Sequence, residues 1–307
     1  MSALVKRIAR FLMRQMVRFR LIKLFSANPR VAERHLFSQN SGKTRLCVFA
    51  SFSKMSEVED YVFANLEALR DFGFDIAFVT TANRIQNADL ERLARLCMCV
   101  MRRENTGYDF GSWKAGILHS GIDLKKYDQL LLTNDSYYGP LFPWQQALAV
   151  AKTDLYGITD SHGIAYHLMS YFVLYNKNIL HSPEFLRAWQ DVRMIPTILK
   201  TLVIYAYEVG MSQKFQQAGF SISAYCAEKE LFERLPQHAH LFNQTIIVHR
   251  FWRELIELMH CPILKVDTFW RVFQGDTAWQ TVLKETGYDT QLIERHQKRL
   301  HAPRENK

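Results

Sequence analysis

Cysteine is scarce in this chain of 307 residues, and its distribution excludes a disulfide-stapled fold. The number of cysteines is odd, and most of them lie in apolar stretches; they are Cys47, Cys97, Cys99, Cys226 and Cys261. Small secreted domains that depend on disulfides carry paired cysteines at much higher density. We therefore expect reduced, buried thiols in a cytoplasmic protein.

The common zinc-binding patterns are also lacking. Cys97-Met98-Cys99 has one residue between the thiols where zinc ribbons have two or more, and no second pair follows. Neither HxxxH nor HExxH occurs in the chain. A thiolate or histidine zinc site is therefore not expected.

Acidic residues are absent from residues 1–25, and no apolar run in the chain is long enough to cross a bilayer. This arm contains Lys6, Arg7, Arg10, Arg14, Arg18, Arg20 and Lys23. Without these seven charges the net charge of the chain falls from +9 to +2. The basic excess therefore belongs to the arm rather than to a surface shaped for nucleic acid, and we expect no nucleic-acid partner.

The arm has the spacing of an amphipathic helix. At 100° per residue one side collects Leu4, Ile8, Phe11, Leu12, Phe19 and Ile22, and the arginines collect on the other. Val17, Leu21, Lys23 and Leu24 depart from this pattern. Three interpretations stay open: a helix lying on an anionic cytoplasmic membrane surface, a helix docked on the protein body, and a mitochondrial presequence.

The remainder reads as an α/β domain. Residues 26–44 are polar and typical of a linker, so we predict an arm and linker over 1–44 and a single domain over 45–301. Strands are predicted over 45–52, 74–80 and 97–103, with helices over 57–71 and 87–96 between them. This alternation predicts a parallel, doubly wound sheet.

The second half is predicted to add strands and then helices. Strands are expected over 127–133, 155–159, 167–175 and 221–226. Helices are expected over 143–151, 184–192, 205–219, 252–258, 277–285 and 290–300. The fold class is therefore a Rossmann-type α/β sheet flanked by helices, with a helical C-terminal region.

Two polar loops follow two of the predicted strands, ENTGYDFGSWK over 104–114 and NDSYYGP over 134–140. Ligands of α/β sheets bind at the carboxyl ends of strands, so we expect both loops to line one site. Asn105 and Asp109 are candidates for contacts with a sugar or base, and Lys114 for neutralising a diphosphate. The structural alternative is that Asp109 caps the helix while Gly107 makes the turn.

Carboxylates supply the chemical candidates. Asp135 can hold a divalent cation that bridges two phosphates, or it can simply form an Asx turn before Gly139-Pro140. Glu208 near a helix start can deprotonate a hydroxyl group, or it can simply stabilise the helix dipole. Asp160, at a strand end, is the rival base.

Several segments together resemble the rhamnan synthesis protein F family of bacterial polysaccharide glycosyltransferases. They are ENTGYDFGSWKAGI, LLLTNDSYYGPLFPW, LYGITDS, HLMSYFVLYNK, YEVGMSQKFQQAGF, FWRELIEL and CPILKV. The resemblance runs from about Cys47 to Asp289 and leaves out the basic arm.

The resemblance implies a glycosyltransferase A type fold with a nucleotide-sugar half over 45–160 and an acceptor half with the C-terminal helices over 161–301. It implies transfer of rhamnose from dTDP-rhamnose to a lipid-linked O-antigen or rhamnan chain, with inversion at the anomeric carbon. The protein is then expected to be cytoplasmic and peripheral on the inner face of the bacterial cell membrane, bound to its anionic surface through residues 1–25. The alternative is a non-catalytic module that binds a nucleotide sugar or glycan and tethers a polysaccharide assembly complex to the membrane.

The resemblance also assigns residue roles. The usual Asp-x-Asp metal element reads Asn134-Asp135-Ser136 here, so Asp135 alone takes the role of ligand to Mg²⁺ or Mn²⁺. Glu208, ahead of Ala218-Gly219-Phe220, is the preferred base and Asp160 the second. Donor contacts are expected from Asn105, Gly107, Tyr108, Asp109, Lys114, Asn134 and Ser136, and acceptor contacts from His167, Ser170 and Tyr207.

Overall fold

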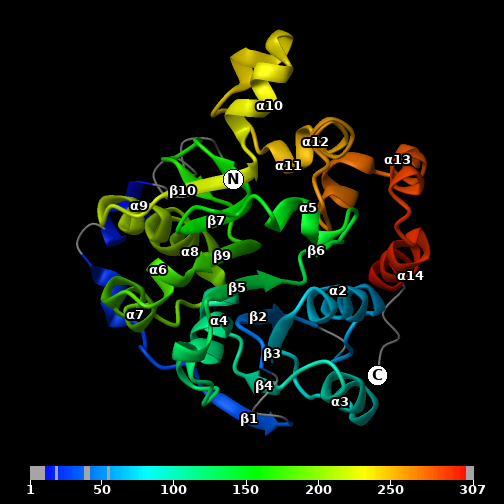
Figure 1. The fold of residues 1–307 in the computed structure, drawn as a ribbon. Helices are drawn as coiled ribbons and strands as arrows, with labels where there is room; N and C mark the ends of the chain where they lie inside the picture. The colour runs from blue at the N-terminus through cyan, green and yellow to red at the C-terminus, as the bar shows by residue number, and fades with distance from the viewer. Residues whose placement is uncertain (1–10, 18–19, 38–41, 54–55, 302–307) are drawn as a thin grey trace.

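The computed structural model describes residues 11–17, 20–37, 42–53 and 56–301. Within these ranges the centre is a nine-stranded mixed sheet of order β1-β4-β3-β2-β5-β9-β7-β10, with β8 paired to β7 (Figure 1). The strands are β1 Val31–Leu36, β2 Arg45–Ser51, β3 Phe74–Thr80, β4 Cys99–Arg103, β5 Gln129–Asn134, β7 Leu155–Ser161, β8 His167–Leu168, β9 Phe172–Asn176 and β10 Ile222–Cys226. The prediction of a mixed α/β sheet flanked by helices is confirmed.

The parallel half consists of β4, β3, β2 and β5. Its crossover helices are α2 Asp60–Asp71, α3 Asn87–Ala94 and α4 Tyr108–Leu118. Strand β2 is central, and its side chains alternate between two cores: Cys47 and Phe49 join one, and Leu46, Val48 and Ala50 join the other. A strand that is buried on both faces has a continuous apolar sequence. The strands of this half could therefore be predicted from the sequence.

Helix α4 lies unusually close to β2. A Cβ added at Gly116 would sit 2.3 Å from Val48 Cγ1, so only glycine allows this approach. The helix therefore has a defined height above the sheet, and its first turn, which carries Asp109, lies over the strand ends.

The other half of the sheet is mainly antiparallel. Strand β9 runs antiparallel to β5 and β7, and β10 runs parallel to β7. The predicted strand 167–175 is wrong as one element, because a turn at residues 169–171 separates β8 from β9. The predicted helix 205–219 is π-helical over Ile204–Val209 (η4) before α9 Gly210–Gln217. The remaining helices of this half are α5 Trp144–Leu148, α6 Lys177–Leu180, α7 Pro183–Gln190 and α8 Lys200–Val203, with η3 Thr197–Leu199; η2 Leu124–Lys126 precedes β5 in the parallel half.

The C-terminal region is helical, as predicted, but it also supplies one strand of a second, two-stranded sheet. Its helices are α10 Glu228–Arg234, η5 Pro236–Leu241, α11 Ile247–Arg250, α12 Trp252–Met259, η6 Phe269–Phe273, α13 Ala278–Thr286 and α14 Thr290–His301. Strand β11 Leu264–Lys265 pairs antiparallel with β6 Tyr137–Tyr138, a connection that the sequence reasoning missed. Helix α14 ends beside α2 (Figure 1).

The predicted linker is partly wrong. Residues 31–36 form β1, which pairs antiparallel with the edge strand β4. Before it, η1 spans Leu21–Leu24, and residues 11–17 are helical. Met13, Met16 and Val17 pack against the core cluster that includes Trp113 and Tyr207, whereas residues 1–10 and 18–19 of the predicted amphipathic arm lie outside the described residues.

Phe11 and Leu12 are 59% and 53% exposed. The helical segment 11–17 therefore has apolar side chains on two sides. Those of one side pack on the core, and Phe11 and Leu12 on the other side are exposed to solvent. No helix in the described ranges is both long and apolar enough to span a membrane. All five cysteines are buried free thiols.

Candidate active site

The loop after β4 is shaped by Arg103, a buried residue that the sequence reasoning passed over. Its guanidinium donates to three backbone carbonyls, those of Glu104 (2.6 Å), Thr106 (2.5 Å) and Tyr108 (2.5 Å). Its Nε donates to Ser112 Oγ at 3.0 Å. A Cβ at Gly111 would lie 2.9 Å from the guanidinium carbon, so the second glycine of the GYDFG run makes room for this clamp.

Gly107 and Tyr108 hold the same loop against the segment that follows α7. Gly107 has φ +75°, and its N–H donates to the Ile195 carbonyl at 2.8 Å. The Tyr108 hydroxyl donates to the Thr197 carbonyl. The expectation that Gly107 makes the turn is confirmed, whereas contacts of these two residues and of exposed Asn105 with a donor stay predictions.

Asp109 and Asp135 are brought together through Asn134. The Asn134 side-chain amide donates to Asp109 Oδ2 at 2.8 Å, and its Oδ1 accepts from the backbone N–H of Ser136 at 3.1 Å. Asp109 is therefore bonded across the site rather than to its own helix end, where Gly107 is the N-cap. The two polar loops do converge at the carboxyl ends of their strands.

Asp135 is held by the end of β2. Its Oδ2 accepts from the Phe52 N–H at 2.7 Å and from Ser51 Oγ at 2.9 Å. The Tyr61 hydroxyl donates to its backbone carbonyl at 2.6 Å. Burial, and secondarily the negative charge of Asp109, raise the pKa of the Asp135 carboxyl to about 7, although the hydrogen bonds from Phe52 and Ser51 oppose the shift.

Burial also raises the pKa of Asp109, although the Asn134 amide and the Lys265 ammonium oppose the shift. Two crowded carboxylates with raised pKa values are suited to a divalent cation, which would relieve their repulsion. The hydrogen bonds described for both engage Oδ2 and leave Oδ1 for a ligand. No group of three or more His, Cys, Asp or Glu side chains in the described ranges is arranged to hold a metal alone. The residues thus fit a Mg²⁺-like site completed by phosphate oxygens.

Lys265 is the main residue that the sequence reasoning missed. Its ammonium donates to Ser136 Oγ at 2.6 Å and lies 4.5 Å from the centroid of the Tyr171 ring. Burial lowers its pKa to about 8, while the carboxylates of Asp267, Asp109, Glu208 and Asp135 oppose that shift. The CPILKV segment contains it, but one lysine in an apolar run carries no signal of where its strand will pair.

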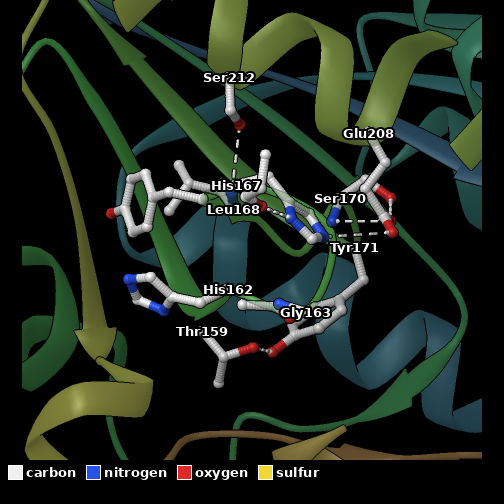
Figure 2. Close-up of polar contacts among 12 residues, drawn as sticks. Thr159, His162, Gly163, His167, Leu168, Ser170, Tyr171, Glu208 and Ser212 are labelled. Carbon is white, nitrogen blue, oxygen red and sulfur yellow. Dashed lines mark hydrogen bonds and ion pairs between the residues drawn. The ribbon is translucent and has the colours of Figure 1, made fainter. Parts of the chain in front are cut away.

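Glu208 faces the turn between β8 and β9 (Figure 2). Its Oε2 accepts from the Ser170 hydroxyl and from the Ser170 N–H at 3.2 Å, and Oε1 lies 3.9 Å from His167 Nε2. The other ring nitrogen of His167 is 2.8 Å from the Ala165 carbonyl, which holds the ring in place. Three predicted residues, Glu208, His167 and Ser170, therefore form one cluster.

Three predicted site residues have structural roles instead. The buried Lys114 ammonium donates to the carbonyls of Gln190 and Val192, each at 2.7 Å, so it cannot neutralise a diphosphate. The buried Tyr207 hydroxyl is bonded to the backbone of Arg193 and is not free for an acceptor. Asp160 is buried, and its Oδ1 accepts from the Glu228 N–H at 2.6 Å at the start of α10, which corrects its role as rival base.

Two pockets flank these clusters. One is mostly apolar and is lined by Trp113, Trp189 and Met211, with Ser170 and Glu208 among its polar groups. The other lies where β2 and β3 end, and its lining includes Ser53, Thr80, Arg84 and Asp89. The carboxylate of Asp89 accepts from the Val58 N–H at 3.0 Å, which ties the loop after β2 to α3.

A comparison with protein-family models matches residues 76–307 to the rhamnan synthesis protein F family. The chain belongs to this family. The resemblance inferred from the sequence is thereby confirmed, and membership supports a sugar transferase of polysaccharide synthesis.

Two curated relatives are similar to part of the chain. Uncharacterized protein y4gN of Sinorhizobium fredii is 26% identical over 179 residues, which cover 56% of this chain and 46% of that protein. Virulence protein VirA of Vibrio anguillarum is 27% identical over 190 residues, 61% of each chain. The chain therefore spans about half to three fifths of the length of the curated relatives it matches.

Solved structures show more distant likenesses. A putative nucleotide-diphospho-sugar transferase from Desulfovibrio desulfuricans has 12% identity and a TM-score of 0.34, covering 81% of this chain and 97% of its own. The glycosyltransferase GlyE of Streptococcus pneumoniae has 13% identity and a TM-score of 0.39, covering 86% of this chain and 66% of its own.

Proposed function

We propose that the protein is a glycosyltransferase that moves a sugar from a nucleoside-diphosphate donor to a glycan acceptor. The observation that carries the proposal is the convergence of Asp109 and Asp135 through Asn134. The Lys265 ammonium interacts electrostatically with both aspartates and with Glu208. This arrangement provides carboxylates and a cation for a diphosphate at one end and a carboxylate base at the other.

The donor would bind along the ends of β2, β3 and β5. The pocket lined by Ser53, Thr80 and Asp89 is our candidate for the nucleoside, because the residues just before Ser53 bond Asp135. Oδ1 of Asp135, with Asp109 beside it, would hold Mg²⁺ or Mn²⁺ together with the diphosphate. When bound, such a cation supplies positive charge where the diphosphate leaves.

The acceptor would be activated by Glu208. Its carboxylate takes the proton of the attacking hydroxyl while the new bond forms at the anomeric carbon and the bond to the diphosphate breaks. Ser170 orients the carboxylate through Oε2, and His167 lies beside Oε1. Attack from the face opposite the diphosphate would invert the configuration.

The finer assignment is dTDP-rhamnose as donor and a lipid-linked O-antigen or rhamnan chain as acceptor, at the inner face of the bacterial cell membrane. Family membership supports this choice. The exposed Phe11 and Leu12 at the edge of the basic arm support a peripheral location.

The first experiment tests purified protein with Mg²⁺ against a panel of dTDP-, UDP- and GDP-sugars, with release of nucleoside diphosphate as the readout. Asp135→Asn keeps the oxygen that accepts from Ser51 and Phe52 but removes the charge, so the variant should fold. We expect its turnover to fall by about 10²-fold or more with an unchanged melting temperature. Wild-type turnover in this variant would contradict the role of Asp135.

The alternative is a non-catalytic module that binds a nucleotide sugar or glycan and tethers an assembly complex to the membrane. The same panel separates the two functions. Binding of a donor without hydrolysis or transfer, even with a short glycan acceptor present, would favour the module.

A further inference from the structure

Lys265 reaches the donor loop through a backbone connection. Strand β11 pairs with β6 so that Lys265 stands opposite Tyr137, and the N–H of Val266 donates to the Ser136 carbonyl at 3.0 Å. The side chain then reaches back to Ser136 Oγ at 2.6 Å. Two contacts to one residue of the NDS turn set the position of the ammonium relative to Asp135.

The aromatic ring beneath the ammonium is itself immobilised. The Tyr171 hydroxyl is 2.6 Å from Thr159 Oγ1 (Figure 2). The Tyr171 backbone carbonyl accepts from Thr133 Oγ1 at 2.8 Å. An ammonium over the face of such a ring is stabilised as a cation. Tyr171 directly follows Ser170, the partner of Glu208, so the ammonium lies between the donor loop and the base.

Within the described part of the chain, the Lys265 ammonium forms no direct ion pair. Its direct contacts there are the Ser136 hydroxyl and the Tyr171 ring. An ammonium has three N–H donors, and Ser136 takes one of them. Asp267, Asp109, Glu208 and Asp135 act on it electrostatically from around the site. A half-buried cation with spare donors is suited to an anionic ligand.

We propose that Lys265 binds the diphosphate of the donor and stabilises it as the leaving group. The inference rests on the proposed transferase function and adds a catalytic residue to it. Lys265 donates a hydrogen bond to a diphosphate oxygen and gives up no proton. The electron pair of the breaking sugar–oxygen bond passes to the diphosphate, and the acceptor proton passes to Glu208.

The carboxylates around the site explain why both a lysine and a divalent cation are needed. Asp109, Asp135 and Glu208 outnumber the single ammonium, so a diphosphate with further negative charge requires more positive charge than Lys265 supplies. Lys265 would bind the diphosphate from the side of Ser136. The divalent cation would bind the diphosphate from the side of Asp135.

The test compares Lys265→Met with wild type by calorimetry, using dTDP, UDP and GDP, the matching monophosphates and the nucleosides, all with Mg²⁺. Methionine matches the lysine side chain as far as Cε and lacks only the ammonium, so an apolar chain still packs on Tyr171. We expect the affinity for the diphosphate to fall by about 10-fold or more, and the affinity for the nucleoside to stay within about 2-fold. Lys229→Met, at a lysine that is 77% exposed, is the matched control and should change nothing.

Each outcome decides the proposal. Unchanged diphosphate affinity in Lys265→Met overturns it, and so does an equal loss for nucleoside and diphosphate, which would show a merely structural role. If wild type binds no nucleoside diphosphate, the proposed transferase function itself fails. Lys265→Gln, whose amide can still donate to Ser136, replaces the methionine variant if that variant melts early. Lys265→Arg should restore part of the lost affinity.

Discussion

At the scale of single residues, two carboxylates in the molecule that look alike in the sequence have different surroundings. Asp160 and Glu208 both lie near the ends of elements. Asp160 is buried and bonded to the start of α10, whereas Glu208 borders a pocket and is bonded to Ser170. Only the second arrangement leaves an oxygen open to a hydroxyl group of a substrate.

Replacement of Glu208 tests this distinction. Glu208→Gln keeps an oxygen for Ser170 but cannot take a proton, so we expect turnover to fall by about 10²-fold or more with little change in donor affinity. Steady-state transfer kinetics measure it. Asp160→Asn is the matched control and should transfer normally once its stability is accounted for. The reverse result would return the base to Asp160.

The sequence was sufficient for some residues and not for others. Asn134 ends β5, Asp135 and Ser136 follow it, and Asp109 lies in the first turn of the helix after β4. Strand prediction was therefore enough to place them at one edge of the sheet. Lys114 lies five residues after Asp109, which at 100° per residue turns it about 140° away from that side chain. Tyr207 likewise adjoins Glu208 but faces Arg193. Side-chain direction, rather than residue type, decides which of the predicted residues face the candidate site.

At the scale of elements, helix α14 contacts the residues that support Asp135. The ring of His296 lies 4.7 Å from that of Tyr61, which bonds Asp135, and its Nδ1 is 2.7 Å from the Tyr138 hydroxyl. The Gln297 side-chain amide donates to the same hydroxyl at 2.7 Å. Burial, and secondarily Arg299, lowers the pKa of His296 to about 4.

This histidine predicts a loss of stability in acid. The folded chain binds the proton less readily than the unfolded chain, whose histidine has the ordinary pKa of 6.5, so stability falls as pH falls from there toward 4. At pH 5 the loss is about 2 kcal/mol relative to pH 7. Urea unfolding of wild type and His296→Asn at both pH values measures it. An equal pH dependence in the two proteins would contradict this assignment.

Elements that depend on local pattern were predicted well, and elements that depend on distant partners were not. The runs 74–80 and 45–52 are β-branched and aromatic, and they became β3 and β2 within one residue. The two-residue strands β6 and β11 have no periodicity to detect, and they form only because they pair with each other. The π-helical turn at Ile204–Val209 could not be predicted either, since the spacing of its apolar residues resembles that of an ordinary α-helix.

At the scale of the whole molecule, the amino-terminal arm and the body are not separate units. Met13, Met16 and Ile22 pack on the core cluster that includes Trp113 and Tyr207, and β1 closes one edge of the sheet. The predicted boundary at residue 44 fails because a short polar strand on a sheet edge resembles a linker in composition. The side of the helical turn bearing Phe11 and Leu12 stays open.

The membrane proposal is tested at those two residues. Deleting the arm would uncover the core, so we choose Phe11→Ser with Leu12→Ser. Sedimentation with vesicles that contain anionic lipid should fall roughly 10-fold, and raised salt should weaken wild-type binding. Val150→Ser, at another apolar side chain that is 55% exposed, is the control. Equal vesicle binding by the double variant and wild type would end the proposal.

The pairing of β11 with β6 has a consequence for folding during synthesis on the ribosome. Lys265 meets Ser136 across 129 positions of the chain. While a ribosome is still extending the polypeptide, the sheet and both aspartate turns can already have assembled, yet the ammonium has not been synthesised. A nascent chain halted before that point would therefore present a nearly finished donor surface that is too negative to retain a nucleoside diphosphate.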